Sequence, residues 1–141
     1  MGTFSERIKE LMSEHGYNTI TLGEAVGVYA NNVSTWINNN SDVKLSTLIK
    51  LSNLFGVSIE FLSGRIEIDE ITVKNTNINF YDRLSKILEE KSITKYNLNK
   101  HVLNSKSTIY QWKKGSEPRL SSLIAIADYL DVTIDYLVGR E

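Results

Sequence analysis

STIYQWKKGSEPRL, residues 107–120, places one tryptophan among hydroxyl groups, an amide and two lysines. Ile109 and Trp112 are three residues apart, so on a helix they share one face. The pattern predicts a helix over residues 106–113 with its indole packed in a core and its polar side facing outward. The alternative, a tryptophan exposed as a stacking platform for bases, suits this apolar pairing less well. The polar side is therefore the candidate binding surface.

The chain repeats itself over most of its length. Aligned on itself at an offset of 76 residues up to the tryptophans, and 75 after them, it has 15 identities in 54 positions. Trp36 then falls on Trp112, and Leu45 on Leu120. A repeat this long is not a solenoid period. It predicts a duplicated domain, with domain 1 over residues 1–65, domain 2 over residues 80–141 and a linker over residues 66–79.

Each domain is predicted to contain five short helices, so the fold class is all-α. Gly115 and Pro118 break the chain after the tryptophan helix, since glycine permits positive φ and proline cannot continue a helix. Ser105 is expected to cap the helix that begins at Lys106 by accepting an orphan N–H. The first helix of domain 2 has an apolar stripe at i, i+4, i+7 and i+8, formed by Phe80, Leu84, Ile87 and Leu88.

The segment between the domains has another pattern. Its β-branched residues roughly alternate at Ile66, Ile68, Ile71 and Val73, and a polar run follows. We interpret residues 66–79 as a short extended linker. The alternative is a β-strand that pairs with a second chain.

The ordered motifs resemble those of the phage repressor and Cro-type helix-turn-helix family, often called XRE. The residues that carry the resemblance are LNKHVLNSKSTI (98–109), YQWKKG (110–115) and VTIDYLVG (132–139), echoed by LGEAVGV (22–28), VSTW (33–36) and VSIEFLSG (57–64). The resemblance covers everything except the linker. It implies two tandem lambda-repressor-like domains of five helices each, in a bacterial protein encoded by a phage or another mobile element.

The resemblance also implies sequence-specific binding of double-stranded DNA, with the third helix of domain 2 in the major groove. In this family Lys106, Ser107 and Gln111 would meet base edges, and Lys95 a phosphate. Their chemistry agrees, because glutamine pairs with an adenine edge and lysine with a guanine edge or a phosphate. The expected DNA-binding residues are Lys95, Lys106, Ser107, Thr108, Tyr110, Gln111, Lys113 and Lys114.

Charge separates the two domains, although the whole chain has a formal net charge of −1. Residues 91–119 carry seven basic side chains against one acidic one, a net charge of +6. The matching residues 15–44 carry one lysine against two acids, a net charge of −1. Affinity for DNA comes mostly from cations that displace condensed counterions. Domain 2 is therefore the expected DNA-binding domain.

Domain 1 departs from the family pattern. Tyr29 stands where Ser105 caps, Val43 stands at the place of the proline, and Asn38–Ser41 replaces the glycine turn. Two interpretations of domain 1 stay open. In the first, it is a subordinate DNA-binding module tethered by the linker, and the two half-sites lie about 34 Å apart or a multiple of that. In the second, which we favour, it is a protein-binding or dimerising domain. Its outward residues, the secondary DNA-binding candidates, are Thr19, Ala30, Asn31, Asn32 and Thr35.

Other function classes have little support. His15 and His101 do not correspond between the domains and lack a second histidine at metal-ligand spacing, and no nucleotide-loop or nucleophile motif occurs. We therefore expect no enzyme, no metal and no cofactor. Domains this small are also expected to leave no room for a sizeable pocket beside their cores.

Composition also bears on the cellular compartment in which the protein is expected. With no cysteine, no apolar run of about 18 residues and no signal-peptide pattern at the N-terminus, we expect a cytoplasmic protein without membrane association. Double-stranded DNA is the expected partner, and a repressor that forms a homodimer is the expected form. The rival is a protein-binding module on the same scaffold, such as an antitoxin or an inhibitor of a partner protein.

Overall fold

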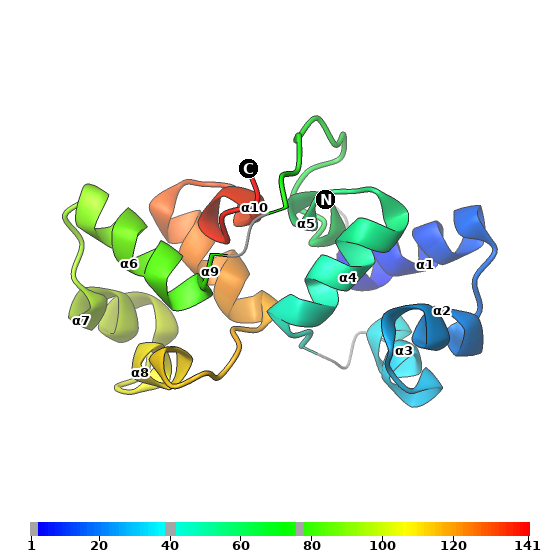
Figure 1. Ribbon diagram of the computed structural model, residues 1–141, viewed down its shortest axis with the longest axis horizontal. Helices are drawn as coiled ribbons and strands as arrows, with labels where there is room; N and C mark the ends of the chain where they lie inside the picture. The colour runs from blue at the N-terminus through cyan, green and yellow to red at the C-terminus, as the bar shows by residue number, and fades with distance from the viewer. Residues whose placement is uncertain (1–2, 39–41, 76–77) are drawn as a thin grey trace. The chain divides into compact units, whose positions relative to one another are not determined.

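The computed structural model describes residues 3–38, 42–75 and 78–141, and within these ranges every regular element is a helix (Figure 1). The chain divides into two compact units, Met1–Ile71 and Thr72–Glu141. From here on, domain 1 and domain 2 mean these two units. The predicted all-α class and the tandem helix-turn-helix arrangement are confirmed.

Among the residues described, domain 1 has five helices, and the same order recurs in domain 2 with one insertion. Domain 1 contains α1 (Phe4–His15), α2 (Thr19–Val26), α3 (Ala30–Ile37), α4 (Leu45–Phe55) and α5 (Ile59–Leu62). Domain 2 contains α6 (Phe80–Glu90), α7 (Lys95–Leu98), α8 (Thr108–Lys113), α9 (Leu120–Leu130) and α10 (Ile134–Leu137). A π-helical turn, η1 (Asn99–Leu103), continues α7 directly.

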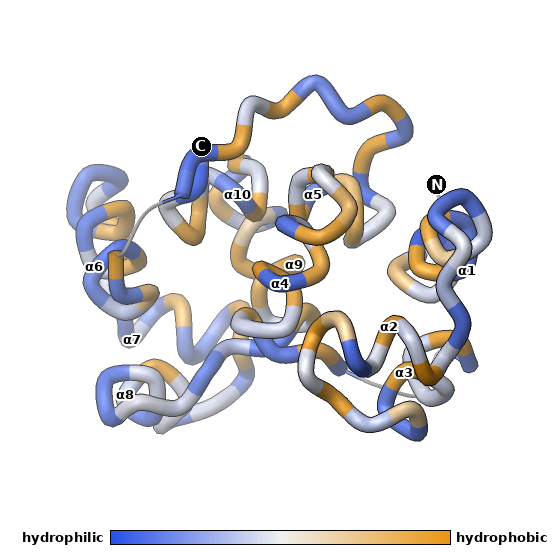
Figure 2. The backbone as a smooth tube through the Cα atoms, turned by 45° about the vertical axis from the view of Figure 1, so that its right-hand side comes forward, coloured by the Kyte–Doolittle hydropathy of each residue, from blue (hydrophilic) through white to orange (hydrophobic). Residues whose placement is uncertain are grey.

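Each core is built around one tryptophan. Trp112 on α8 is 6% exposed and meets the edge of Phe80 on α6, with the ring centroids 5.3 Å apart. Trp36 on α3 makes the same contact with Phe4 on α1 at 6.2 Å. Figure 2 shows the hydrophobic residues of α1 and α6 recurring in bands along each helix, as an amphipathic helix requires. The prediction that Trp112 is a core residue is confirmed.

The second helix differs between the domains because of one side chain. In domain 1 the chain after α2 passes so close to Gly23 that a Cβ atom there would lie 2.6 Å from the backbone oxygen of Val28. Domain 2 has Asn99 at the matching position, and its side chain would clash with such a path. The wider π-helical turn η1 begins at this asparagine. We attribute the extra width of the turn to the missing glycine.

The wider turn moves the end of the helix by one residue. Gly27 ends α2 in the left-handed conformation, but Leu103 stands at the matching position in domain 2. Asn104 adopts the left-handed conformation instead, with φ of 51°, which asparagine tolerates far better than leucine. As a result α8 begins at Thr108, and the prediction of a helix from Lys106 was wrong by two residues.

The predicted linker is partly held by domain 1. Arg7 is 5% exposed, and its guanidinium donates hydrogen bonds to the carbonyl oxygens of Phe61 at 3.2 Å and Ile66 at 2.7 Å. The carboxylate of Asp69 accepts hydrogen bonds from the backbone N–H and the hydroxyl of Ser58, both at 2.8 Å. Residues 66–69 are therefore held by hydrogen bonds to the helices of domain 1 and belong to that unit.

The β-strand alternative, which requires pairing with a second chain, stays a prediction. Residues 66–75 and 78–79 contain no strand, while residues 76–77 lie outside the described part of the chain. On the domain 2 side, the backbone N–H of Lys74 donates a hydrogen bond to the carbonyl oxygen of Arg140 at 2.6 Å. The segment bends at residues 67–68 and is held by hydrogen bonds near both of its ends.

The end of each domain repeats a buried pairing of an acid and an arginine five residues apart. In domain 1, Nη1 of Arg65 lies 3.3 Å from Oε1 of Glu60, and both side chains are mostly buried. In domain 2 the matching residues are Asp135 and Arg140. Burial lowers the pKa of the Arg140 guanidinium, and the Asp135 carboxylate raises it in part. An arginine remains cationic at neutral pH despite such a shift, so the pairing stays ionic.

Candidate nucleic-acid interface

The third helix of domain 2 separates buried apolar residues from exposed polar ones. Ile109 is 2% exposed and lies with Trp112 in the core. The predicted site residues around them are exposed, except for Thr108, which is half-buried. The exposed ones are Lys106, Ser107, Tyr110, Gln111, Lys113 and Lys114. The structure thus exposes one amide and three lysines on and beside a short helix.

Side chains from the preceding turn satisfy the first N–H groups of α8. The hydroxyl of Ser105 accepts hydrogen bonds from the N–H groups of Ser107 and Thr108, both at 3.2 Å. Oδ1 of Asn99 accepts one from Ile109 at 3.4 Å. Ser105 therefore accepts orphan N–H groups as predicted, but the N-cap residue of α8 is Ser107, whose side chain makes no capping hydrogen bond. Lys106 and Ser107, which were predicted to be helical, form a bend before the helix. The N–H of Ser107 is bound by a side chain, while its carbonyl oxygen accepts a helical hydrogen bond from the N–H of Gln111 at 2.9 Å.

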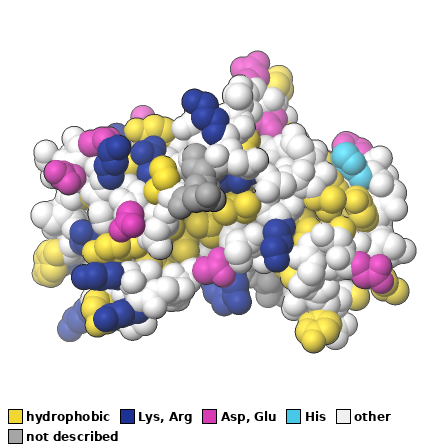
Figure 3. Space-filling model, in the orientation of Figure 1, with side chains coloured by type: hydrophobic (Ala, Val, Ile, Leu, Met, Phe, Trp, Pro, Cys, Tyr) yellow, Lys and Arg dark blue, Asp and Glu magenta, His cyan; other side chains and the backbone are white. Residues whose placement is uncertain are grey.

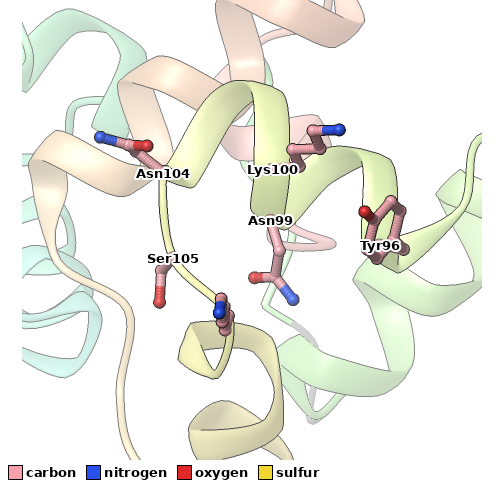
Figure 4. A pocket seen from close by; sticks show the side chains of 6 residues that line it. Tyr96, Asn99, Lys100, Asn104 and Ser105 are labelled. Carbon is pink, nitrogen blue, oxygen red and sulfur yellow. The ribbon is translucent and has the colours of Figure 1, made fainter.

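A hollow opens beside this capped turn. It has a volume of about 560 Å³, and Figure 4 shows it between η1 and the start of α8. Asn99 points into the middle of this view, with Ser105 facing it from the connecting loop. Its lining residues are Tyr96, Asn99, Lys100, Asn104, Ser105 and Lys106. The expectation that such small domains have no sizeable pocket was wrong for domain 2, where residues of η1 and of the loop after it line this hollow.

The remaining cation of the predicted site lies at the start of α7. Lys95 is the first residue of that helix and is exposed. Lys100, one turn further along, is exposed as well and was not among the predicted site residues. Figure 3 shows dark-blue side chains gathered over the α7 and α8 region. The second and third helices of domain 2 therefore expose cations next to one another.

Tyrosine rings accompany three of these lysines, and the sequence pattern alone did not lead us to expect this feature. The ammonium group of Lys95 lies 5.2 Å from the ring centroid of Tyr81. Lys100 lies 5.8 Å from the ring of Tyr96, and Lys114 lies 5.3 Å from that of Tyr110. Two of the pairs are four residues apart on one helical segment, a spacing that the sequence could have revealed.

The corresponding surface of domain 1 has a different character. Asn31, Asn32 and Thr35 are exposed on α3, while Thr19 and Ala30 are half-buried. Two large apolar side chains stand out beside them: Ile20 is 60% exposed and Tyr29 is 84% exposed. No lysine or arginine lies on α2 or α3. Residues 39–41 of the predicted Asn38–Ser41 turn lie outside the described part of the chain.

Neither a metal-ligand cluster nor a membrane span occurs among the residues that the structure describes. These residues contain no group of three or more histidine, cysteine or acidic side chains able to hold a metal ion. None of the helices described has the length and apolar character that crossing a bilayer requires.

Comparison with known proteins agrees with this geometry. The family model of the Cro/C1-type HTH DNA-binding domain matches the chain twice, over residues 7–74 and 83–141. The HTH-type transcriptional regulator ImmR of Bacillus subtilis (strain 168) is 33% identical over 88 residues, which cover 62% of this chain and 64% of that protein.

A second relative comes from the same organism. The SPbeta prophage-derived uncharacterized HTH-type transcriptional regulator YonR is 31% identical over 72 residues, covering 48% of this chain and 67% of YonR. The chain thus spans about two thirds of the length of each of these two relatives.

Proposed function

Since the chain belongs to the Cro/C1-type HTH DNA-binding family, we propose that domain 2 binds double-stranded DNA sequence-specifically and that the protein regulates transcription as a repressor. The observation that carries the proposal is the arrangement of α8. Its apolar residues are buried against α6, while its amide and lysine side chains are exposed. The names of ImmR and YonR, both transcriptional regulators, support the regulatory part.

The size of α8 suits the major groove. An α-helix with its side chains is about 10–12 Å in diameter, and the major groove of B-DNA is about 12 Å wide. In this proposal Gln111 meets an adenine edge, and Lys106 meets a guanine edge or a phosphate. Ser107 and Thr108 precede or begin the helix, where hydroxyl groups can bond bases or the backbone.

Phosphate contacts would hold the helix in place. Lys95 at the start of α7 and Lys113 and Lys114 at the end of α8 are the proposed phosphate ligands, and Lys100 extends this set. Contacts of this kind fix register and orientation without carrying sequence information. Specificity would then rest on Lys106, Ser107 and Gln111.

A salt titration of duplex binding tests the proposal. If Lys95, Lys100, Lys113 and Lys114 each neutralise one phosphate, the log–log plot of association constant against salt concentration should have a slope of about −3 to −4. Fluorescence anisotropy with a labelled duplex measures it. Weak binding with a flat salt dependence would contradict a phosphate-anchored interface and favour the protein-binding alternative.

Domain 1 has a second candidate function, binding of another protein or of a second copy to form the expected homodimer. The exposed Ile20 and Tyr29 favour it, since exposed apolar side chains on or beside helices without lysine or arginine suit protein contacts better than phosphates. Under this proposal the secondary candidates Thr19, Ala30, Asn31, Asn32 and Thr35 touch no base.

Selection of bound sequences from a random duplex pool separates the two roles of domain 1. We expect each chain to select one half-site, read by domain 2 alone. Two unlike half-sites, about 34 Å apart or a multiple of that, would instead show that both domains of one chain bind DNA. Replacing Asn31 and Thr35 with alanine serves as the control, because this variant should select the same sequence as the unmodified protein.

A further inference from the structure

Three of the exposed lysines around the proposed DNA interface of domain 2 lie over tyrosine rings. The pairs are Tyr81 with Lys95, Tyr96 with Lys100, and Tyr110 with Lys114, at 5.2, 5.8 and 5.3 Å from ammonium nitrogen to ring centroid. All three distances lie within the range of about 6 Å at which a ring face attracts a cation. Each pair joins a residue of the helix-turn-helix to a neighbour on the same or an adjacent helix.

The duplication provides an internal comparison for these pairs. Domain 1 has the same fold, but neither member of any pair is present at the matching positions. The replacements are Ser5 and Thr19, Ile20 and Glu24, and Ser34 and Asn38. Tyrosine and lysine therefore occur together in the domain with the cationic surface and are absent together from the other. This pattern indicates that each ring serves its lysine rather than the common core.

A second observation also argues against a core role. Tyr96 is 68% exposed and Tyr110 is 53% exposed, so most of each ring faces solvent. An exposed tyrosine contributes little to the packing of its own domain. Its ring face can still restrict a long, flexible lysine side chain.

We propose that Tyr81, Tyr96 and Tyr110 are positioning residues that hold the ammonium groups of Lys95, Lys100 and Lys114 where backbone phosphates arrive. Lysine has four rotatable side-chain bonds and loses much freedom when it binds a phosphate. A ring that already restricts the ammonium group reduces this loss, which is preorganisation. The inference rests on the proposed DNA binding and names a further set of residues for it.

The test replaces the three tyrosines together, once with leucine and once with phenylalanine. Leucine removes the ring, while phenylalanine keeps the ring and removes only the hydroxyl group. The ordering cost of one long side chain at an interface corresponds to about two- to tenfold in affinity, and each ring removes part of this cost, so the leucine variant should bind duplex about 10- to 100-fold more weakly. The phenylalanine variant should bind within about twofold of the unmodified protein, and Tyr129→Leu on α9 is the matched control.

A variant without the three paired lysines shows whether the rings act through them. With Lys95, Lys100 and Lys114 changed to glutamine, the further change of the tyrosines to leucine should alter affinity by less than about twofold, because coupled residues are not additive. In the unbound protein, NMR should show ring-current shifts of the lysine ε-methylene protons that the leucine variant loses. The double variant Y96L/Y110L, at two exposed positions, replaces the triple variant if the latter fails to fold.

Several outcomes would overturn the inference. Equal losses in the phenylalanine and leucine variants would show that the hydroxyl groups contact DNA directly. An undiminished affinity of the leucine variant would show that the rings do not position the lysines. The same loss of affinity in the variant without the three paired lysines would show this as well. A failure of the proposed function is distinguishable, because the unmodified protein would then bind no duplex at all.

Discussion

Replacing Lys106, Lys113 and Lys114 with glutamate is expected to abolish duplex binding and leave the helical content unchanged. Removal of one charge-assisted hydrogen bond to DNA should lower the affinity by about 10- to 100-fold, so the three substitutions together should lower it by at least about 1,000-fold. All three side chains are exposed, and α8 packs on its core through Ile109 and Trp112. Anisotropy titrations measure the binding, and circular dichroism measures the helical content.

A matched variant distinguishes the loss of contacts made by α8 from the effect of the changed net charge. Lys74, Lys86 and Lys91 are also lysines of domain 2, but they lie outside α7 and α8. Changing these three to glutamate alters the net charge by the same amount and should weaken binding far less. If both variants lose affinity equally, general electrostatic attraction rather than contact by α8 explains the binding. Undiminished affinity of the first variant would contradict the proposed interface outright.

Replacing Trp112 with alanine should destabilise domain 2 by about 3–5 kcal/mol, the usual cost of deleting a large buried aromatic side chain. The indole is 6% exposed and packs edge-on against Phe80. A domain of this size has a total free energy of unfolding of only about 4–10 kcal/mol. Domain 2 should therefore become marginally stable, and chemical denaturation followed by circular dichroism should show its transition at much lower denaturant concentration.

The distribution of tryptophans makes this measurement selective. The chain has two tryptophans, one in each domain, so in the Trp112→Ala variant the fluorescence of Trp36 reports on domain 1 alone. Its transition should stay where it is in the unmodified protein. The reciprocal Trp36→Ala variant should show the opposite pattern. A destabilisation below about 1 kcal/mol for Trp112→Ala would mean that the indole is not a packing residue.

The sequence was sufficient to predict the features that depend on apolar spacing and on the repeat. The duplication, the five helices of each domain and the buried position of Trp112 all follow from residues at helical intervals. Such patterns are informative because each amphipathic helix must bury one face. The outward residues of α8 could be predicted for the same reason, since the exposed side of a helix is the complement of its buried side.

The start of α8 could not be predicted in this way. It depends on the backbone path of the turn that begins at Asn99, where domain 1 has Gly23 in close contact with the backbone of Val28, and this is an atomic contact outside α8. Periodicity within one segment carries no information about such a contact. The hollow beside the turn escaped prediction for the same reason.

The tyrosine and lysine pairs were missed for another reason. Exposed charged residues on a helix usually form a solvated surface, so neither Lys100 nor Tyr96 indicates a role when taken separately. Only the comparison of matching positions in the two domains, together with the observed ring distances, makes the pairs visible.

The hydrogen bonds of Arg7 determine where the protein can be dissected. A fragment that stops at residue 65 would lack the carbonyl oxygen of Ile66, which accepts a hydrogen bond from the guanidinium of Arg7, a residue that is 5% exposed. It would also lack the carboxylate of Asp69, which accepts a hydrogen bond from Ser58, the residue that caps α5. Arg7 would keep the carbonyl oxygen of Phe61, but the loss of one of the acceptors of a buried charged group is costly for a small domain. We therefore expect a stable N-terminal fragment to include Asp69 at least, and the first compact unit ends two residues later at Ile71.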